Sequence, residues 1–213
     1  MEDFTKKEKD LIKKLNTPAK IQDYLDTFNI NFEMNGDTCR SPLLTMRSKI
    51  AHCIEGAMLA AFILSCHGYK PLLLDLRSAD HDYDHVVAIY KINGYFGAIS
   101  KTNHAVLRYR EPVYKTIREL AMSYFHEYFL DDGEKTMRSF SEPFDLSVFN
   151  NGKTANWVTT NKNLWYISKV LDNSPHENIA PRKNINKYRK ANKIEIEAGK
   201  LVEWKKGQKK KLY

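Results

Sequence analysis

The sequence predicts an α+β fold in which a central helix packs on an antiparallel sheet. Residues 53–66 are apolar on nearly all sides, as is typical of a buried helix. Residues 70–77 form an apolar run with little alternation, which indicates a strand covered on both faces. Residues 85–92 and 95–100 are typical strands, and the Asn93-Gly94 pair between them is a strong hairpin signal.

Additional elements are expected on the N-terminal side of this core. The first helix covers about residues 4–15 and is rich in lysine. A second helix begins after Thr17, with Pro18 at its first position, and has an apolar face at helical spacing. Residues 31–49 are predicted to be a long connection, because Asn35-Gly36-Asp37 and Ser41-Pro42 carry turn chemistry.

The C-terminal side is predicted from the same kinds of signal. Proline near its start and an aromatic stripe indicate a helix over 112–130. A short strand follows at 135–142, and a helix is expected near 160–172. Alternating polar and apolar residues around Ala198-Gly199 predict a small hairpin within 193–206.

The composition is that of an ordinary globular protein. The 213 residues are 42% hydrophobic and 28% charged, which excludes a disordered chain. Cys39, Cys53 and Cys66 are odd in number and widely spaced, so they form neither a disulfide framework nor a CxxC zinc pattern. Cys66 is interpreted as a packing residue of the central helix, and Cys39 as an incidentally exposed residue of a loop.

The positive net charge is concentrated at the C-terminal end. The chain carries +8 overall. Residues 181–213 hold twelve Lys or Arg against three Glu, whereas the 22 basic and 23 acidic residues of 1–180 nearly cancel. The chain is therefore divided into a main domain, 1–180, and a basic extension, 181–213. Only weak nonspecific contact of this extension with polyanions is expected.

A cytoplasmic location is the expectation. The first residues contain acids and no apolar run, so no signal peptide is indicated. The longest apolar run, residues 57–64, is too short to span a bilayer.

Cys53 lies where a cysteine becomes reactive. It begins the predicted central helix, where unpaired backbone N–H groups and the helix dipole favour a thiolate. A nucleophilic cysteine also needs a base and a group that orients the base. His85 begins one strand of the predicted hairpin and Ser100 ends the other, so both lie at the same end of the hairpin. Cys53 with His85 is therefore the candidate catalytic pair.

The segments HCIEGAMLAAFILSCHGYKPLLLDL, DHVVAIY and GYFGAIS resemble the catalytic core of the transglutaminase-like superfamily, within the papain-like cysteine-protease fold. The core resemblance covers about residues 47–104. A wider similarity, through GAISKTNHAVLRYREPVY and SYFHEYF, is to an uncharacterised bacterial branch of that superfamily. The resemblance implies a transglutaminase-like domain over 1–180, with Cys53 as nucleophile and His85 as base.

Two features depart from the superfamily pattern. The position that holds an acidic residue in the superfamily is Ser100 here, which can orient an imidazole but carries no charge. Asn103 is the alternative orienting residue. The aromatic residue that often follows the histidine is replaced by Val86 and Val87.

The expected function is that of a thiol enzyme that hydrolyses or transfers an amide or peptide acyl group, without a cofactor. Arg108 and Arg110 are candidates for binding an anionic part of the substrate, with a salt-bridged surface edge as the alternative. The competing hypothesis is a catalytically inactive domain of this fold that serves as a binding or scaffold module, possibly one associated with nucleic acid through its basic tail.

Other polar residues carry structural interpretations. The segment HDYDH at 81–85 is interpreted as an acidic turn, with zinc ligation as the minor alternative, so no metal site is predicted. His52 is interpreted as a surface histidine. Asp75, inside an apolar strand, needs a partner, for which Arg77, Arg108 and Arg110 are the candidates.

Overall fold

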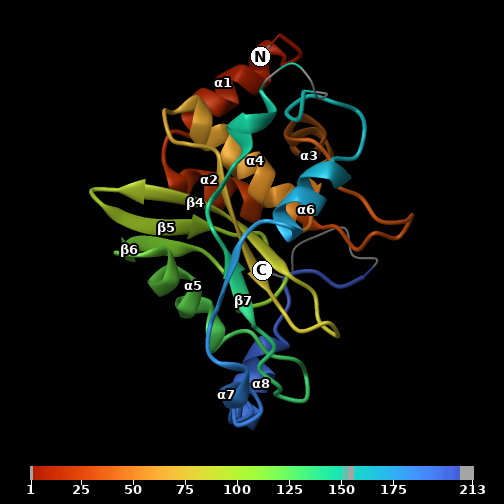
Figure 1. Cartoon of the computed structure of the whole chain (residues 1–213). Coiled ribbons are helices and arrows are strands. Elements are labelled where there is room, and N and C mark those ends of the chain that lie inside the picture. The colour runs from red at the N-terminus through yellow and green to blue at the C-terminus, as the bar shows by residue number, and fades with distance from the viewer. Residues whose placement is uncertain (1, 151, 153–155, 207–213) are drawn as a thin grey trace.

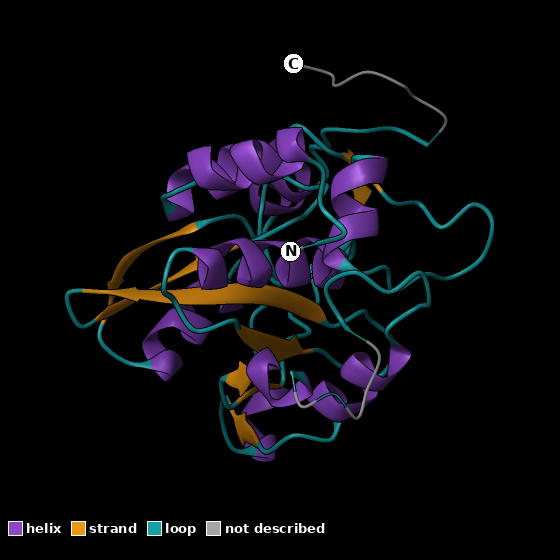
Figure 2. Ribbon diagram, turned by 90° about the horizontal axis from the view of Figure 1, so that it is seen from above, coloured by secondary structure: helices purple, strands orange, loops and turns teal. Residues whose placement is uncertain are grey.

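The fold is built around one main sheet with helices on both faces (Figure 1, Figure 2). It was obtained as a computed structural model that describes residues 2–150, 152 and 156–206. The helical elements are α1 Lys6–Lys14, α2 Pro18–Asp26, α3 Pro42–Ser48, α4 Cys53–Cys66, α5 Ile117–Phe125, the 3₁₀ turn η1 Leu146–Phe149, α6 Trp165–Asp172, α7 Arg182–Ile185 and α8 Lys193–Gly199.

The main sheet is antiparallel between all paired strands, which confirms the expected α+β class. Its order is β6-β5-β4-β3-β7-β9, with β8 also paired to β3. A short parallel pair, β1 with β2, lies apart from it. The strands are β1 Asn29–Ile30, β2 Ile50–Ala51, β3 Leu72–Arg77, β4 His85–Ile92, β5 Tyr95–Ile99, β6 Arg110–Tyr114, β7 Ser139–Ser141, β8 Phe144–Asp145 and β9 His176–Asn178.

Strand β4 is buried on both faces because the sheet separates two hydrophobic cores. Val86 and Ala88 face the core that contains α4, whereas Val87 and Ile89 face the core that contains α5. Since successive side chains of a strand point to opposite faces, both sets must be apolar, which explains the unbroken apolar sequence of this strand.

Helix α4 is the centre of the larger core. It packs against α1, α2, α3, β3 and β4, and its residues from Ile54 to Leu64 are buried. Its bounds, Cys53–Cys66, are those that the apolar run predicts. Gly68 follows with a φ of +86°, and the N–H of Tyr69 returns to the carbonyl of Leu64, so the helix ends where the glycine permits a left-handed turn.

Two predicted elements are wrong, and in each of them a capping residue begins a helix at a position that was not predicted as a helix start. Residues 112–130 are not one helix: Pro112 lies in the edge strand β6, where its missing N–H is tolerated, and Thr116 caps α5 through the N–H of Glu119. The expected hairpin within 193–206 is instead helix α8, because Asn192 and Glu195 form a reciprocal capping box.

The predicted connection over 31–49 contains an unpredicted helix, α3. Ser41 accepts a hydrogen bond from the N–H of Leu44 at 3.4 Å, and Pro42 occupies the first helical position. A hydroxyl residue followed by proline also begins α2, at Thr17-Pro18, where the sequence was correctly interpreted as a helix start.

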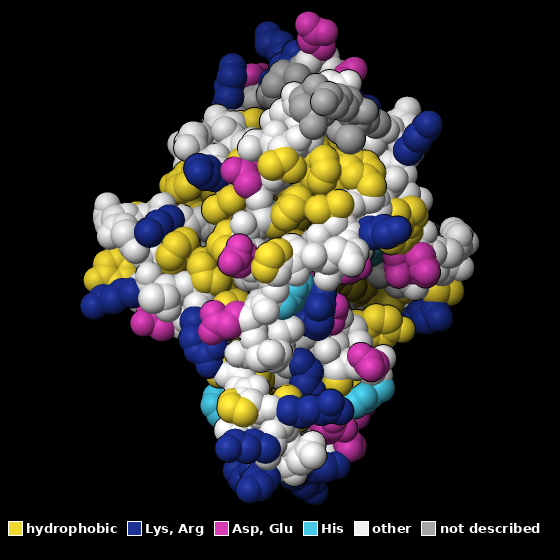
Figure 3. Space-filling view, in the orientation of Figure 1, with side chains coloured by type: hydrophobic (Ala, Val, Ile, Leu, Met, Phe, Trp, Pro, Cys, Tyr) yellow, Lys and Arg dark blue, Asp and Glu magenta, His cyan; other side chains and the backbone are white. Residues whose placement is uncertain are grey.

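The basic extension is packed against the body over its described part. Leu201 and Glu203 make backbone hydrogen bonds with Ala105 and Asn103, and Trp204 is buried. Lys and Arg side chains gather around α7 and α8, at the lower end of Figure 3. Residues 207–213 of the extension lie outside the described residues.

None of the helices in the described part of the chain has the length and apolar character needed to cross a membrane.

The buried helix α4 should tolerate shortened side chains poorly. Leu59 is fully buried, so Leu59→Ala should lower the free energy of unfolding by about 2–5 kcal/mol through lost burial and a residual cavity. The matched control is Leu201→Ala, which removes the same atoms from a side chain that is 56% exposed and should change stability by no more than about 0.5 kcal/mol. Urea titration measures both; equal effects would contradict the burial of α4.

Candidate active site

Cys53 occupies the first position of α4 and is partly exposed. The first N–H groups of a helix have no intrahelical acceptor, so they face the sulfur and any group bound beside it. Two adjoining cavities, of about 400 and 710 Å³, both have Cys53 in their walls. The thiol therefore lies at the junction of two hollows, accessible to a substrate.

His85 and Ser100 meet at the end of the β4–β5 hairpin, as their sequence positions suggest. The Nε2 atom of His85 lies 2.8 Å from Ser100 Oγ. The Ser100 hydroxyl donates its hydrogen to the carbonyl oxygen of Leu107 at 2.6 Å, so it accepts from the imidazole. Nε2 thus carries a proton, which leaves Nδ1 as the nitrogen available to the thiol of Cys53, whose pKa the interaction with His85 lowers.

Ser100 is itself held by Gln22, a residue that the sequence did not single out. The Gln22 side-chain amide donates to the carbonyl of Ser100 and accepts from its N–H, both at 2.9 Å. Gln22 belongs to α2 and is buried, so a helix far away in the sequence fixes the end of β5. Gln22 lies on the same face of α2 as Ile21 and Leu25, and no local pattern distinguishes it from an ordinary helix residue.

His52 is a second partner of the thiol, rather than the surface histidine that was expected. Its Nε2 lies 2.8 Å from the carbonyl oxygen of Thr38, and it also forms a hydrogen bond with Cys53. Burial lowers the pKa of His52, but the contact with Cys53 and the charge of Glu55 outweigh burial and raise it to about 9. His52 is therefore a cation at neutral pH. Its position directly before Cys53 was the available signal.

The two histidines make Cys53 acidic. Burial alone would raise the pKa of the thiol, but the hydrogen bonds from His52 and His85, together with their charges, lower it to about 5. The other cysteines behave in the opposite way: burial raises the pKa of Cys39 to about 12 and also raises that of Cys66. Only at Cys53, among the described cysteines, does the surrounding protein favour the thiolate.

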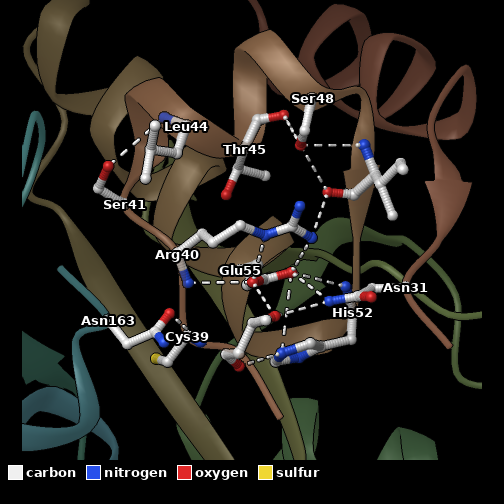
Figure 4. Close-up of polar contacts among 12 residues, drawn as sticks. Asn31, Cys39, Arg40, Ser41, Leu44, Thr45, Ser48, His52, Glu55 and Asn163 are labelled. Atoms are coloured by element: carbon white, nitrogen blue, oxygen red, sulfur yellow. Dashed lines mark hydrogen bonds and ion pairs between the residues drawn. The ribbon is translucent and has the colours of Figure 1, made fainter. Parts of the chain in front are cut away.

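Glu55 holds the front of α4 in place (Figure 4). Its side chain is fully buried and accepts from the Arg40 guanidinium at 2.8 and 2.9 Å and from the hydroxyl of Thr38 at 2.8 Å. It also accepts from the N–H of His52 at 3.3 Å. Burial raises the pKa of this carboxyl, but the Arg40 contact dominates and lowers it to about 2.

Asn103 lines both cavities beside Cys53, but its side-chain hydrogen bonds, like the contacts of Arg108 and Arg110, are made with other parts of the fold. The side-chain amide of Asn103 exchanges two hydrogen bonds with the backbone of Trp204, so Ser100 is the hydrogen-bond partner of His85. The guanidinium of Arg110 pairs with Glu127 at 2.7 Å and stacks on Tyr124. Arg108 lies 3.6 Å from Glu203. Neither arginine belongs to the described walls of the two cavities beside Cys53.

The acidic turn 81–85 is tied into the fold. His81 pairs with Glu134 at 3.3 Å, and Asp84 accepts from the N–H of Ser78 at 2.7 Å. The expected arginine partner of Asp75 is wrong: the contact is with His176, at 3.1 Å. This partner comes from β9, too distant in sequence to be predicted.

One group of side chains in the described residues has spacing that suits a metal ion. Ligand atoms of Asp75, Asp84 and Asp172 lie within 4.8 Å of one another. These are oxygen ligands; of the minor zinc alternative for the segment 81–85, only Asp84 is among them, and His81, His85 and Cys53 are not.

Comparison with known proteins gives no family: no family model matches the sequence, and no curated protein matches it.

Removing the charge of Glu55 should destabilise the fold strongly. In Glu55→Gln, Arg40 loses a buried partner, and we expect a loss of about 3 kcal/mol or more. The matched control is Glu8→Gln. Glu8 also belongs to a capping box, at the start of α1, and also pairs with an arginine, Arg47. This pair lies at the surface, where solvent screens it. Chemical denaturation at neutral pH measures both variants; a comparable small loss in each would show that Glu55 does not hold α4.

Cys53 should react with iodoacetamide at acidic pH. With its pKa lowered to about 5, the thiolate is present above that pH and is lost only as the pH falls through it. The alkylation rate should change less than about twofold between pH 8 and pH 6, whereas an ordinary thiol slows by roughly 75-fold. Mass spectrometry of each thiol supplies the measurement, with Cys66 as internal control. His85→Ala and His52→Ala should each restore the ordinary pH dependence; an unchanged profile in both would refute the assignment.

Proposed function

We propose that this protein is a thiol enzyme that hydrolyses an amide- or peptide-type acyl bond through Cys53 and His85. One observation carries the proposal: the Cys53 thiol lies at a helix N-terminus, between His52 and a His85 ring whose Nε2 is fixed by Ser100. The order of helix, strand and hairpin around these residues agrees with a transglutaminase-like core, the family that the sequence resembles.

Each residue has a defined role in the reaction. The Cys53 thiolate attacks the carbonyl carbon, and the N–H of Cys53 at the helix front stabilises the developing oxyanion. The protonated Nδ1 of His85 gives its proton to the leaving amine, and a thioester forms. His85 then takes a proton from water, which attacks the thioester and releases the acid and the thiolate.

Ser100 acts as a positioning residue. A hydroxyl fixes the ring tautomer as an acidic residue would, but it adds no negative charge to stabilise the imidazolium. His52 compensates in part, because its positive charge stabilises the thiolate directly. The site therefore relies on a pre-formed thiolate more than on a strongly basic His85.

Hydrolysis is preferred over transfer to an amine, because no described residue marks a separate acceptor. A reducing, cytoplasmic compartment suits three cysteines that are all free thiols. Nonspecific polyanion contact remains the proposal for the basic surface around α7 and α8.

Acyl transfer to Cys53 can be tested without knowing the substrate. Incubated with p-nitrophenyl acetate, the protein should show a burst of nitrophenol and an acetyl group on Cys53, both absent in Cys53→Ser. His85→Ala should slow acetylation by about 100-fold or more, because the acid–base group is lost. Ser100→Ala should slow it less, and Cys66→Ser, which removes a thiol at the far end of α4, should leave it unchanged.

The proposal would be contradicted if Cys66 and Cys53 were acetylated alike and the rate of acetylation were the same in His85→Ala as in the wild type. That result would favour an inactive domain of this fold that binds a partner, for which the uncharged third position at Ser100 is the main argument.

A further inference from the structure

We propose that the larger cavity beside Cys53 binds an organic cation, the ammonium or guanidinium group of a lysine or arginine side chain, next to the acyl bond under attack. This inference names a substrate class for the proposed function and rests on it.

The charge of this cavity is the first argument. Its described walls include no Lys or Arg, although the chain as a whole carries +8. Five acidic residues contribute to these walls, together with the thiol and His52: Glu33, Asp37, Asp75, Asp84 and Asp172. Even with His52 charged, the acidic residues of these walls outnumber it, and a pocket with such an excess of one sign attracts ligands of the opposite sign. An anionic substrate would be repelled at this place.

Asp75 shows where the cation would lie. Its side chain is fully buried, and its Oδ1 atom has no hydrogen-bond partner among the described residues. The other oxygen contacts His176 at 3.1 Å. Because a buried carboxylate oxygen without a partner is costly, the structure holds an acceptor that a bound donor would satisfy.

Two further carboxylates surround the same point. Asp84 and Asp172 come from the start of β4 and the end of α6, and their oxygens lie within 4.8 Å of each other and of Asp75. Burial and the charge of Asp84 raise the pKa of Asp75 to about 6 and also raise that of Asp172. Arg77 donates to the backbone carbonyl of Asp172, and its charge opposes only part of this rise. One arginine against three carboxylates leaves the cluster with an excess of negative charge.

The rim of the cavity favours an organic cation over a bare metal ion. Phe32, Tyr83 and Trp165 line it, and all three are exposed, Tyr83 at 91% and Trp165 at 47%. Aromatic faces attract ammonium and guanidinium groups and cover the aliphatic stem of a basic side chain. Hard divalent metals take oxygen ligands and water and gain nothing from such a rim.

The smaller cavity is a weaker candidate, because Lys101 contributes to its walls and two of its acids are paired. Asp82 accepts from the hydroxyl of Thr136, and Glu127 pairs with Arg110. The cationic group is therefore assigned to the side of Cys53 where Asp75 and Asp172 lie.

The charge preference can be measured with small thiol reagents on the full chain. Three methanethiosulfonates share one reactive group and differ in charge: the trimethylammonium-ethyl and sulfonato-ethyl compounds carry opposite charges on the same ethyl chain, and the smaller methyl compound is neutral. Each forms a mixed disulfide with a thiolate and releases methanesulfinate. Rates at Cys53 and Cys66 are followed by mass spectrometry at pH 7.5, in low salt and in 1 M NaCl.

At Cys53 the ratio of cationic to anionic rate should exceed the ratio at Cys66 by about tenfold or more, and should shrink in 1 M NaCl. Asp172→Asn and Asp37→Asn should each lower the ratio at Cys53, after normalisation to the neutral reagent in the same variant. Asp145→Asn, which lies outside the cavity walls, is the matched control and should leave the ratio unchanged.

Equal charge ratios at Cys53 and Cys66, or a ratio insensitive to Asp172→Asn, would overturn the inference. A metal site would be shown instead if millimolar Ca²⁺ or Mg²⁺, at constant ionic strength, saturably abolished the preference in the wild type. Failure of the proposed enzyme is seen separately, in the pH dependence of the neutral reagent, which does not depend on the charge of the cavity.

Discussion

The ion pair between Glu55 and Arg40 is the constraint on which the site depends. One buried carboxylate joins the segment around Thr38, the backbone N–H of His52 and the first turn of α4. A second nitrogen of Arg40 reaches the carbonyl of Ile50, so β2 is held as well. A charge buried this deeply is stable only when fully paired, which makes the geometry nearly unique. Cys53 is presented between two histidines because that network leaves α4 no other starting position.

In the proposed reaction, the two histidines divide the work that one catalytic histidine usually performs with an acidic partner. His52 lies near Glu55 and Glu33, and its raised pKa keeps it charged next to the thiol. His85 is buried, and the partner of its Nε2 is the neutral Ser100. Thus the positive charge that stabilises the thiolate and the group that moves the proton are separate residues. This arrangement gives a physical reason why an uncharged third position is compatible with a reactive Cys53.

Local signals were reliable where burial and capping agreed. The bounds of α4 and of the β4–β5 hairpin followed from an unbroken apolar run, Gly68 and Asn93-Gly94. They failed where a few residues supported two structures. At α8, alternation over a short stretch favoured strands, but the capping box at Asn192 satisfied two helix N–H groups. At β6, Pro112 was compatible with either a helix start or an edge strand, and pairing with β5 decided.

The sequence alone determined that a thiol begins a buried helix and that a histidine and a serine share one end of a hairpin, because helix phase, strand alternation and turn chemistry are short-range properties. Tertiary structure alone decided what surrounds them. Three hydrogen-bonded pairs join residues that are 78, 15 and 101 positions apart in the sequence: Gln22 with Ser100, Arg40 with Glu55, and His176 with Asp75. Such pairs satisfy buried polar groups, and nothing in the neighbouring sequence shows which distant partner will do so.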